Sequence, residues 1–174
     1  MHAALPRRFQ DLPVTPPDFR ERFEANDAAN FGVSRNHNND YLISRTEWHA
    51  DLHIAGQFQV LAQFESDFAP RKTTLTPADR DVLDLEQAFV TVNEPVGDGT
   101  ARVCLGRQQM NFDFQRFVSD RDGPNVRQSF DAAWGEYEKG HWKFISFYSQ
   151  PVQIYNFGAQ PFDSYSSGAN TSVW

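Results

Sequence analysis

The sequence predicts an all-β fold, an antiparallel up-and-down meander of about seven long strands. Apolar residues recur with a period of two, as they do in a strand that has one apolar face. The alternating runs are about ten residues long, nearer to the ~9–11 residues of a strand that crosses a bilayer than to the ~5–6 of soluble sheets. Short and long connections alternate between the runs, and no run shows an apolar stripe at helical spacing.

Composition excludes several classes of protein. The chain has 174 residues, a formal net charge of -7 and one cysteine, Cys104, and this length indicates a single domain. A mean hydropathy of -0.61 and the lack of any apolar run near ~18 residues exclude a transmembrane helix. They leave a membrane barrel open, because its strands alternate polar with apolar residues. The lone cysteine excludes an internal disulfide, zinc-ligand spacing is missing, and the acidic balance argues against a nucleic-acid partner.

The first predicted element is an extended leader over residues 1–18. Prolines cannot occupy a central strand or a helix interior, and this stretch contains four of them. They are Pro6, Pro13, Pro16 and Pro17. The stretch Met1–Phe9 contains arginines but lacks the apolar core of a secretory signal. We therefore expect either a cytoplasmic protein or a chain whose start is missing, with ordered structure from about Phe19.

The clearest strands are 42–54 and 57–65, joined by a tight turn at Ala55-Gly56 into a hairpin. In the first strand, one alternating set is mostly apolar and the other is strongly polar. The apolar set is Leu42, Ser44, Thr46, Trp48, Ala50, Leu52 and Ile54, and the polar set is Ile43, Arg45, Glu47, His49, Asp51 and His53. The pattern therefore predicts a sheet with an apolar face and a polar face.

Further strands are expected along the rest of the chain. Their ranges are 19–25, 83–93, 100–109, 129–138 and 141–150, and the facing of the last two is not determined by the pattern. The long connections are 26–40, 67–82 and 110–128, and the short ones are 55–56, 93–100 and 139–140. Short turns at one end and long loops at the other are typical of outer-membrane barrels.

Five segments carry a resemblance to a known family. They are Arg20–Glu24, His49–His53, Leu83–Phe89, Leu105–Gln109 and Asp122–Asp131. Together they resemble the N-terminal half of the alginate export family of bacterial outer-membrane porins, over about residues 19–152. The most specific segment is Asp122–Asp131, in which Gly123-Pro124 sets a loop before a strand begins.

The resemblance implies a channel. It implies a monomeric barrel of the 18-stranded type, roughly the strand number that a polar pore needs, in the outer membrane of a Gram-negative bacterium. Such a barrel faces lipid outside and passes anionic polysaccharide or a related anionic solute through an arginine-containing lumen. Only about seven strands are present here and no signal peptide is visible, so we expect a truncated chain. The predicted parts are the leader 1–18, a partial alginate-export-type barrel over 19–152 and a Gly/Ser/Asn-rich tail over 153–174.

The predicted substrate-binding residues are charged side chains. A planar guanidinium holds a carboxylate through two parallel hydrogen bonds, and an anionic sugar polymer presents one carboxylate on each unit. We therefore expect Arg107, Arg121 and Arg127 to contact the solute. Their counter-charges and polar neighbours are expected to be Asp131, Glu47, Asp51 and His49. The competing interpretation of each arginine is a surface ion pair worth ~0–1 kcal/mol.

The predicted facing of Arg107 conflicts with a role in binding the solute. Strict alternation places it on the same face as Val103 and Leu105, which is the apolar face. Either Arg107 lies at the membrane rim or a bulge turns its side chain.

Two other classes of protein stay open at this point. A soluble carbohydrate-binding β-sandwich would pack the apolar faces of 48–54 and 58–64 on a second sheet. A metalloenzyme would use His49, Asp51 and His53, but successive same-face residues of a strand lie about 6.6 Å apart and do not converge on one ion. We therefore expect no metal, no cofactor and no enzymatic activity.

Overall fold

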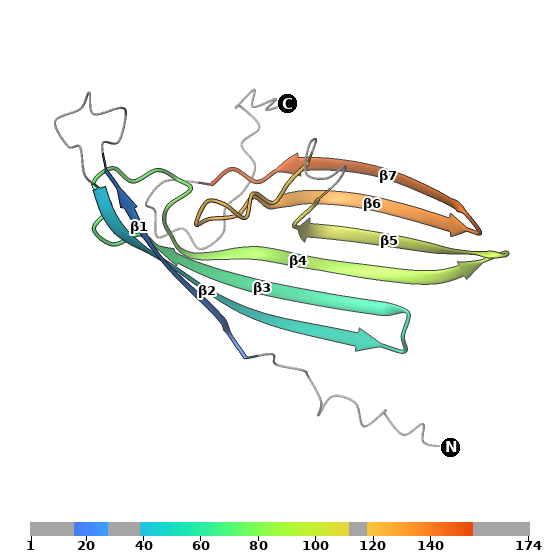
Figure 1. Ribbon diagram of the computed structural model, residues 1–174. Coiled ribbons are helices and arrows are strands. Elements are labelled where there is room, and N and C mark those ends of the chain that lie inside the picture. The colour runs from blue at the N-terminus through green and yellow to red at the C-terminus, as the bar shows by residue number, and fades with distance from the viewer. Residues whose placement is uncertain (1–15, 28–38, 112–117, 155–174) are drawn as a thin grey trace, which may run out of the picture.

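The computed structural model describes residues 16–27, 39–111 and 118–154, in which seven strands form one antiparallel sheet (Figure 1). Each strand pairs with the next along the chain, from β1 to β7. The strands are β1 (Asp18–Asn26), β2 (Asn39–Ile54), β3 (Phe58–Phe68), β4 (Asp81–Val96), β5 (Gly99–Gln108), β6 (Phe130–Lys139) and β7 (Trp142–Pro151). The predicted all-β meander is confirmed, and the described residues contain no helix.

The connections alternate in length, as predicted. Short turns join β2 to β3, β4 to β5 and β6 to β7, and they lie together at one end of the sheet (Figure 1). Gly97 and Gly140 open two of these turns at φ 60° and 58°, a left-handed backbone that glycine adopts without strain. Longer segments, 69–80 and 109–129, connect the strands at the other end. We call these the turn end and the loop end.

One face of the sheet is apolar and exposed. The register of strand pairing places one apolar residue from each of six strands in a row, so that the six side chains share this face. The row is Leu52, Val60, Val90, Leu105, Ala133 and Tyr148. Trp48, Phe58 and Phe64 are also exposed. A β-sandwich would bury such a face against a second sheet, and the described residues form only this one. The structure therefore does not favour the sandwich alternative.

The opposite face is polar and, at the loop end, buried. The largest fully buried side chains are Arg45, Glu65, Glu86, Asp67 and Ser129, and all of them are polar. Water-soluble domains have the reverse arrangement, with apolar side chains inside. An apolar exterior with a polar interior is typical of the wall of an outer-membrane channel.

The loop that precedes β6 lies against this polar face. Asn125 is 3% exposed, and its Nδ2 donates to the carbonyl oxygens of Ser44, Phe68 and Asp79 at 3.2, 3.2 and 3.1 Å. The backbone N–H groups of Asn125 and Val126 both donate to Ala78 O, at 3.1 and 3.0 Å. The loop is therefore tied to β2, to β3 and to the 69–80 connection.

No helix among the described residues has the length and apolarity needed to cross a membrane. Residues 1–15 of the predicted leader and 155–174 of the predicted tail lie outside the described residues. The division of the chain at 18 and 152 stays a prediction.

Candidate functional site

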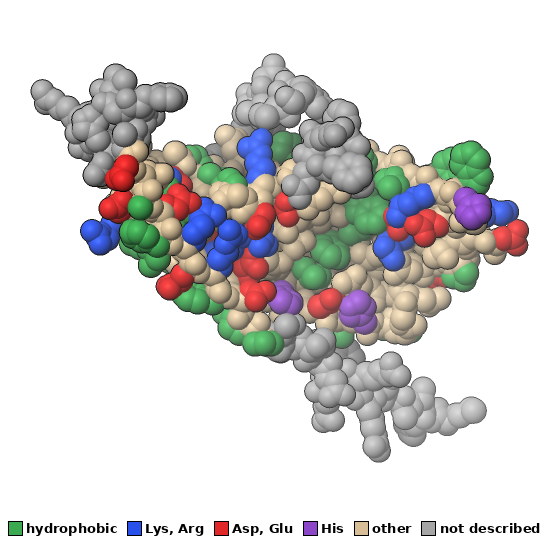
Figure 2. Space-filling view, in the orientation of Figure 1, with side chains coloured by type: hydrophobic (Ala, Val, Ile, Leu, Met, Phe, Trp, Pro, Cys, Tyr) green, Lys and Arg blue, Asp and Glu red, His purple; other side chains and the backbone are tan. Residues whose placement is uncertain are grey.

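The register gathers two rows of charged side chains at the loop end of the polar face. One row is Arg20, Arg45, Asp67 and Asp81, and the other is Asp18, Glu47, Glu65 and Asp84. Register partners on neighbouring strands lie on the same side of a sheet, so residues far apart in sequence meet here. Figure 2 shows acidic and basic side chains gathered over this part of the molecule.

A cavity opens between β1, β2 and the loop before β6. Its volume is about 210 Å³. It is lined by Asp18, Phe19, Arg20, Arg45, Glu47 and Arg127, and we call it the arginine cavity. Three of its six lining residues are arginines, so it presents guanidinium donors that suit a carboxylate.

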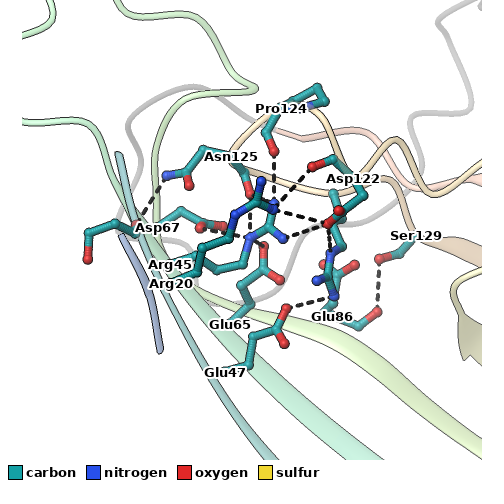
Figure 3. A network of polar contacts seen from close by, with 12 residues as sticks. Arg20, Arg45, Glu47, Glu65, Asp67, Glu86, Asp122, Pro124, Asn125 and Ser129 are labelled. Atoms are coloured by element: carbon teal, nitrogen blue, oxygen red, sulfur yellow. Dashed lines mark hydrogen bonds and ion pairs between the residues drawn. The ribbon is translucent and has the colours of Figure 1, made fainter. Parts of the chain in front are cut away.

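Asp122 contacts all three arginines of the cavity, and Figure 3 labels it with two of them, Arg20 and Arg45. Its Oδ1 lies 3.3 Å from Arg20 Nη1, 3.1 Å from Arg45 Nη1 and 3.1 Å from Arg127 Nε. Burial alone would raise the pKa of Asp122, but the hydrogen bonds from Arg45 and Arg127 outweigh it and hold that pKa below its ordinary value of 3.8. Asp122 therefore stays ionised over the physiological range.

Arg45 is the buried centre of the network, with a side chain only 2% exposed. Its Nε donates to Asn125 O and its Nη2 to Pro124 O, both at 2.8 Å, and Nη2 also donates to Asn125 O. The same Nε lies 3.9 Å from Glu65 Oε1 and 3.7 Å from Asp67 Oδ1. One guanidinium thus donates to two loop carbonyls and forms ion pairs with three carboxylates, which links the loop to the strands.

Arg127 and Glu47, both predicted as site residues, are brought together. Arg127 Nη1 lies 2.7 Å from Glu47 Oε1. Burial opposes the charge of Arg127, but the carboxylates of Glu47 and Glu65 outweigh it and hold the pKa of Arg127 above its ordinary value. Arg127 therefore keeps its positive charge in this half-buried position.

Arg107 and Asp131, both predicted as site residues, form a separate pair. Arg107 Nε and Nη2 lie 3.0 and 3.3 Å from the two oxygens of Asp131, and Nη1 donates to Leu85 O at 3.3 Å. The preceding Gly106 has φ +126°, and a Cβ there would lie 2.3 Å from Ala88 O, so only glycine fits. Arg107 thus follows an irregular stretch of backbone and does not line the arginine cavity.

The other predicted residues lie elsewhere. Asp51 accepts from Gln59 Nε2 at 3.0 Å and lies 3.1 Å from His53 Nε2. His49 faces Gln63 across β2 and β3. Arg121 is exposed at φ 54°, with its backbone N–H bonded to Ser119 Oγ at 3.1 Å. Among the described residues, no group of three or more metal-binding side chains has a geometry that could hold an ion.

Three residues of the site, Arg20, Arg45 and Asp122, were not predicted from the sequence. A signal for Arg45 was present, because it belongs to the same alternating polar set as Glu47, His49 and Asp51. Arg20 and Asp122 carried no comparable signal. Their meeting depends on how β1 pairs with β2 and on how the loop before β6 folds back.

An exposed apolar face, a polar face with charged side chains and an antiparallel meander define a segment of an outer-membrane β-barrel porin. A family model described as alginate export matches residues 17–165. The chain belongs to the alginate export family, a family of transport porins, and the resemblance found in the sequence is confirmed. Searches of curated proteins and of solved structures find no match.

Proposed function

We propose that this chain forms part of the wall of a monomeric outer-membrane channel that exports an anionic, alginate-like polysaccharide. The family supports export of a polysaccharide. The observation that carries the anionic part is the arginine cavity, in which three guanidinium groups lie on the polar face of the sheet. A polymer with one carboxylate on each sugar unit would meet these groups as it passes.

The size of the cavity suits brief contact with a moving polymer. At about 210 Å³ it is smaller than the ~300–1,000 Å³ of typical small-molecule sites, so it would hold part of one sugar unit at a time. A channel also needs binding that is weak enough to allow release. Glu47 and Asp122 already partner the arginines, which limits how strongly they hold a passing anion.

We propose a secondary role for the remaining predicted residues. Arg107 with Asp131 would form a second charged contact along the wall, and Arg121 would add positive charge at the exposed loop. His49 and Asp51 would line the polar face nearer to the turn end, between the arginine cavity and the turn that joins β2 to β3.

Planar-bilayer recordings of the assembled channel, of which this chain forms part of the wall, test this proposal. Replacing Arg127 with alanine should move the reversal potential toward less anion selectivity and weaken block by a uronate trisaccharide about tenfold, because a charge-assisted hydrogen bond is worth ~1.5–3 kcal/mol. The matched control is Arg71→Ala, an exposed loop arginine that does not line the cavity. Unchanged selectivity and block in Arg127→Ala would remove the arginine cavity from the solute path.

A further inference from the structure

We propose that Asp122 is a built-in competitor of the solute, whose carboxylate pairs with the three arginines of the arginine cavity until a uronate displaces it. This inference rests on the proposed function, because that function assigns the same arginines to the solute. It goes further by assigning to one residue of the chain the place where the ligand carboxylate binds.

The contacts of Asp122 are those expected for a bound carboxylate ligand. Guanidinium groups from β1, β2 and the loop itself converge on one oxygen, Oδ1, at 3.3, 3.1 and 3.1 Å. One carboxylate oxygen has two lone pairs, whereas each guanidinium has five N–H donors. The three arginines therefore offer more donors than Asp122 uses, and a solute carboxylate could bind in its place.

The exposure of Asp122 suits a group that can be displaced. Its side chain is 58% exposed, whereas its partner Arg45 is 2% exposed and Arg127 is 20% exposed. Asp122 thus reaches its partners from the solvent side, which is the side from which a solute would approach. The low pKa of Asp122 agrees with this, because an ionised carboxylate competes for the arginines at neutral pH.

The loop does not depend on Asp122 for its position. Asn125, three residues further on, holds three carbonyl groups of the neighbouring elements, and Arg45 also donates to Pro124 O and Asn125 O. Displacement of the Asp122 carboxylate would therefore leave the rest of the loop docked. Within this loop, Asn125 holds the backbone in place and Asp122 competes for the arginines.

Calorimetric titration of the detergent-purified protein with a uronate trisaccharide tests the inference. If Asp122 occupies the site for most of the time, Asp122→Asn and Asp122→Ala should each tighten binding by about tenfold or more, because the competent fraction rises. Adding Arg127→Ala to Asp122→Asn should abolish the gain. Asp98→Asn, which removes the exposed partner of Lys139 in the turn between β4 and β5, should leave the affinity unchanged.

The titrations distinguish a failure of the inference from a failure of the proposed function. If folded Asp122→Asn and Asp122→Ala bind the trisaccharide no more tightly than the wild type does, Asp122 is not a competitor. Binding by the wild type would still support the proposed function. Lack of binding by the wild type and both variants overturns the proposed function and the inference with it. An equal gain in Asp98→Asn would also overturn the inference, because it would show a general effect of lost negative charge.

Asn125→Ala is the structural comparison. It removes three buried donor contacts of the loop without touching the charge of Asp122, so it should lower the free energy of unfolding by about 1–3 kcal/mol. It should not tighten binding. A gain in affinity as large as that of Asp122→Asn would show that loosening the loop, and not removal of a competitor, opens the site.

Discussion

Both ends of the sheet carry ion pairs, but the pairs at the loop end are buried and those at the turn end are more exposed. At the loop end, Arg45 and its partners Glu65 and Asp67 are almost fully enclosed. At the turn end, Lys143 lies 2.8 Å from both Glu136 and Glu138 and remains exposed. The pairs of Arg45 with Glu65 and Asp67 are the longer ones, at 3.9 and 3.7 Å, so it is burial and not distance that makes the loop-end network sensitive to the loss of one partner.

The connections explain this difference. At the turn end, short turns join the strands and reach no further than the strand tips. At the loop end, the segment before β6 is long enough to return over the polar face, where Asn125 docks it. The loop excludes water from Arg45, so the charges beneath it interact through a medium of lower effective dielectric constant.

The largest effect is expected from Arg45→Met, which keeps the length of the side chain but removes its charge. Glu65 and Asp67 would lose their buried positive partner, and the carbonyls of Pro124 and Asn125 would lose their donor. We expect a loss of about 3–5 kcal/mol in the free energy of unfolding, measured by denaturant titration in detergent. Adding Glu65→Gln and Asp67→Asn should restore part of the loss. A loss below about 1 kcal/mol would contradict the buried network.

A smaller effect is expected from acid. The pKa of Asp122 is lowered in the folded protein, so its contribution to stability is present above its ordinary value of 3.8 and is lost as pH falls through the folded value, which lies below 3.8. The difference in stability between the wild type and Asp122→Asn should therefore be constant above pH 3.8 and shrink below it. Paired denaturant titrations across this range measure the difference, and a difference that grows toward low pH would contradict the assignment.

Asp79 should respond in the same direction. Burial alone would raise the pKa of Asp79, but the hydrogen bonds from Lys72 and Thr76 outweigh it and hold that pKa below 3.8. The double variant Asp79→Asn with Asp122→Asn should lose less stability on acidification than either single variant does.

The smallest effect is expected from Lys143→Met at the turn end. When Lys143 is removed, Glu138 remains hydrated because its side chain is 55% exposed, and Glu136, which is 11% exposed, keeps Arg102 as a partner at 3.3 Å. The denaturant midpoint should stay within experimental error of the wild type, at low and at high salt. A clear shift would show that exposure does not separate the two ends.

Much of the fold followed from local patterns. Alternation over 42–54 predicted both the strand and its two faces, because side chains of a strand point to opposite sides. The lengths of the connections predicted which ends of the strands carry turns, and the structure confirms them. The facing of 129–138 and 141–150 did not follow, because apolar and polar residues mix there. In the structure, register pairs Trp134 with Phe147 and Glu136 with Ile145.

The candidate site was only partly accessible to sequence reasoning. Four of the predicted residues form two ion pairs in the structure, Arg127 with Glu47 and Arg107 with Asp131. Arg127 and Glu47 line the arginine cavity, and Arg107 does not. Whether these residues contact a solute stays a proposal.

The sequence by itself determined the periodic features of this protein: the strands, the turns between them, and the apolar and polar faces. These features depend on neighbours along the chain, and alternation and turn residues specify them directly. Only the tertiary structure decided that Arg20, Arg45 and Arg127 meet at Asp122, over about a hundred residues of chain. That meeting depends on strand register and on the docking of a loop, and no local pattern encodes either of them.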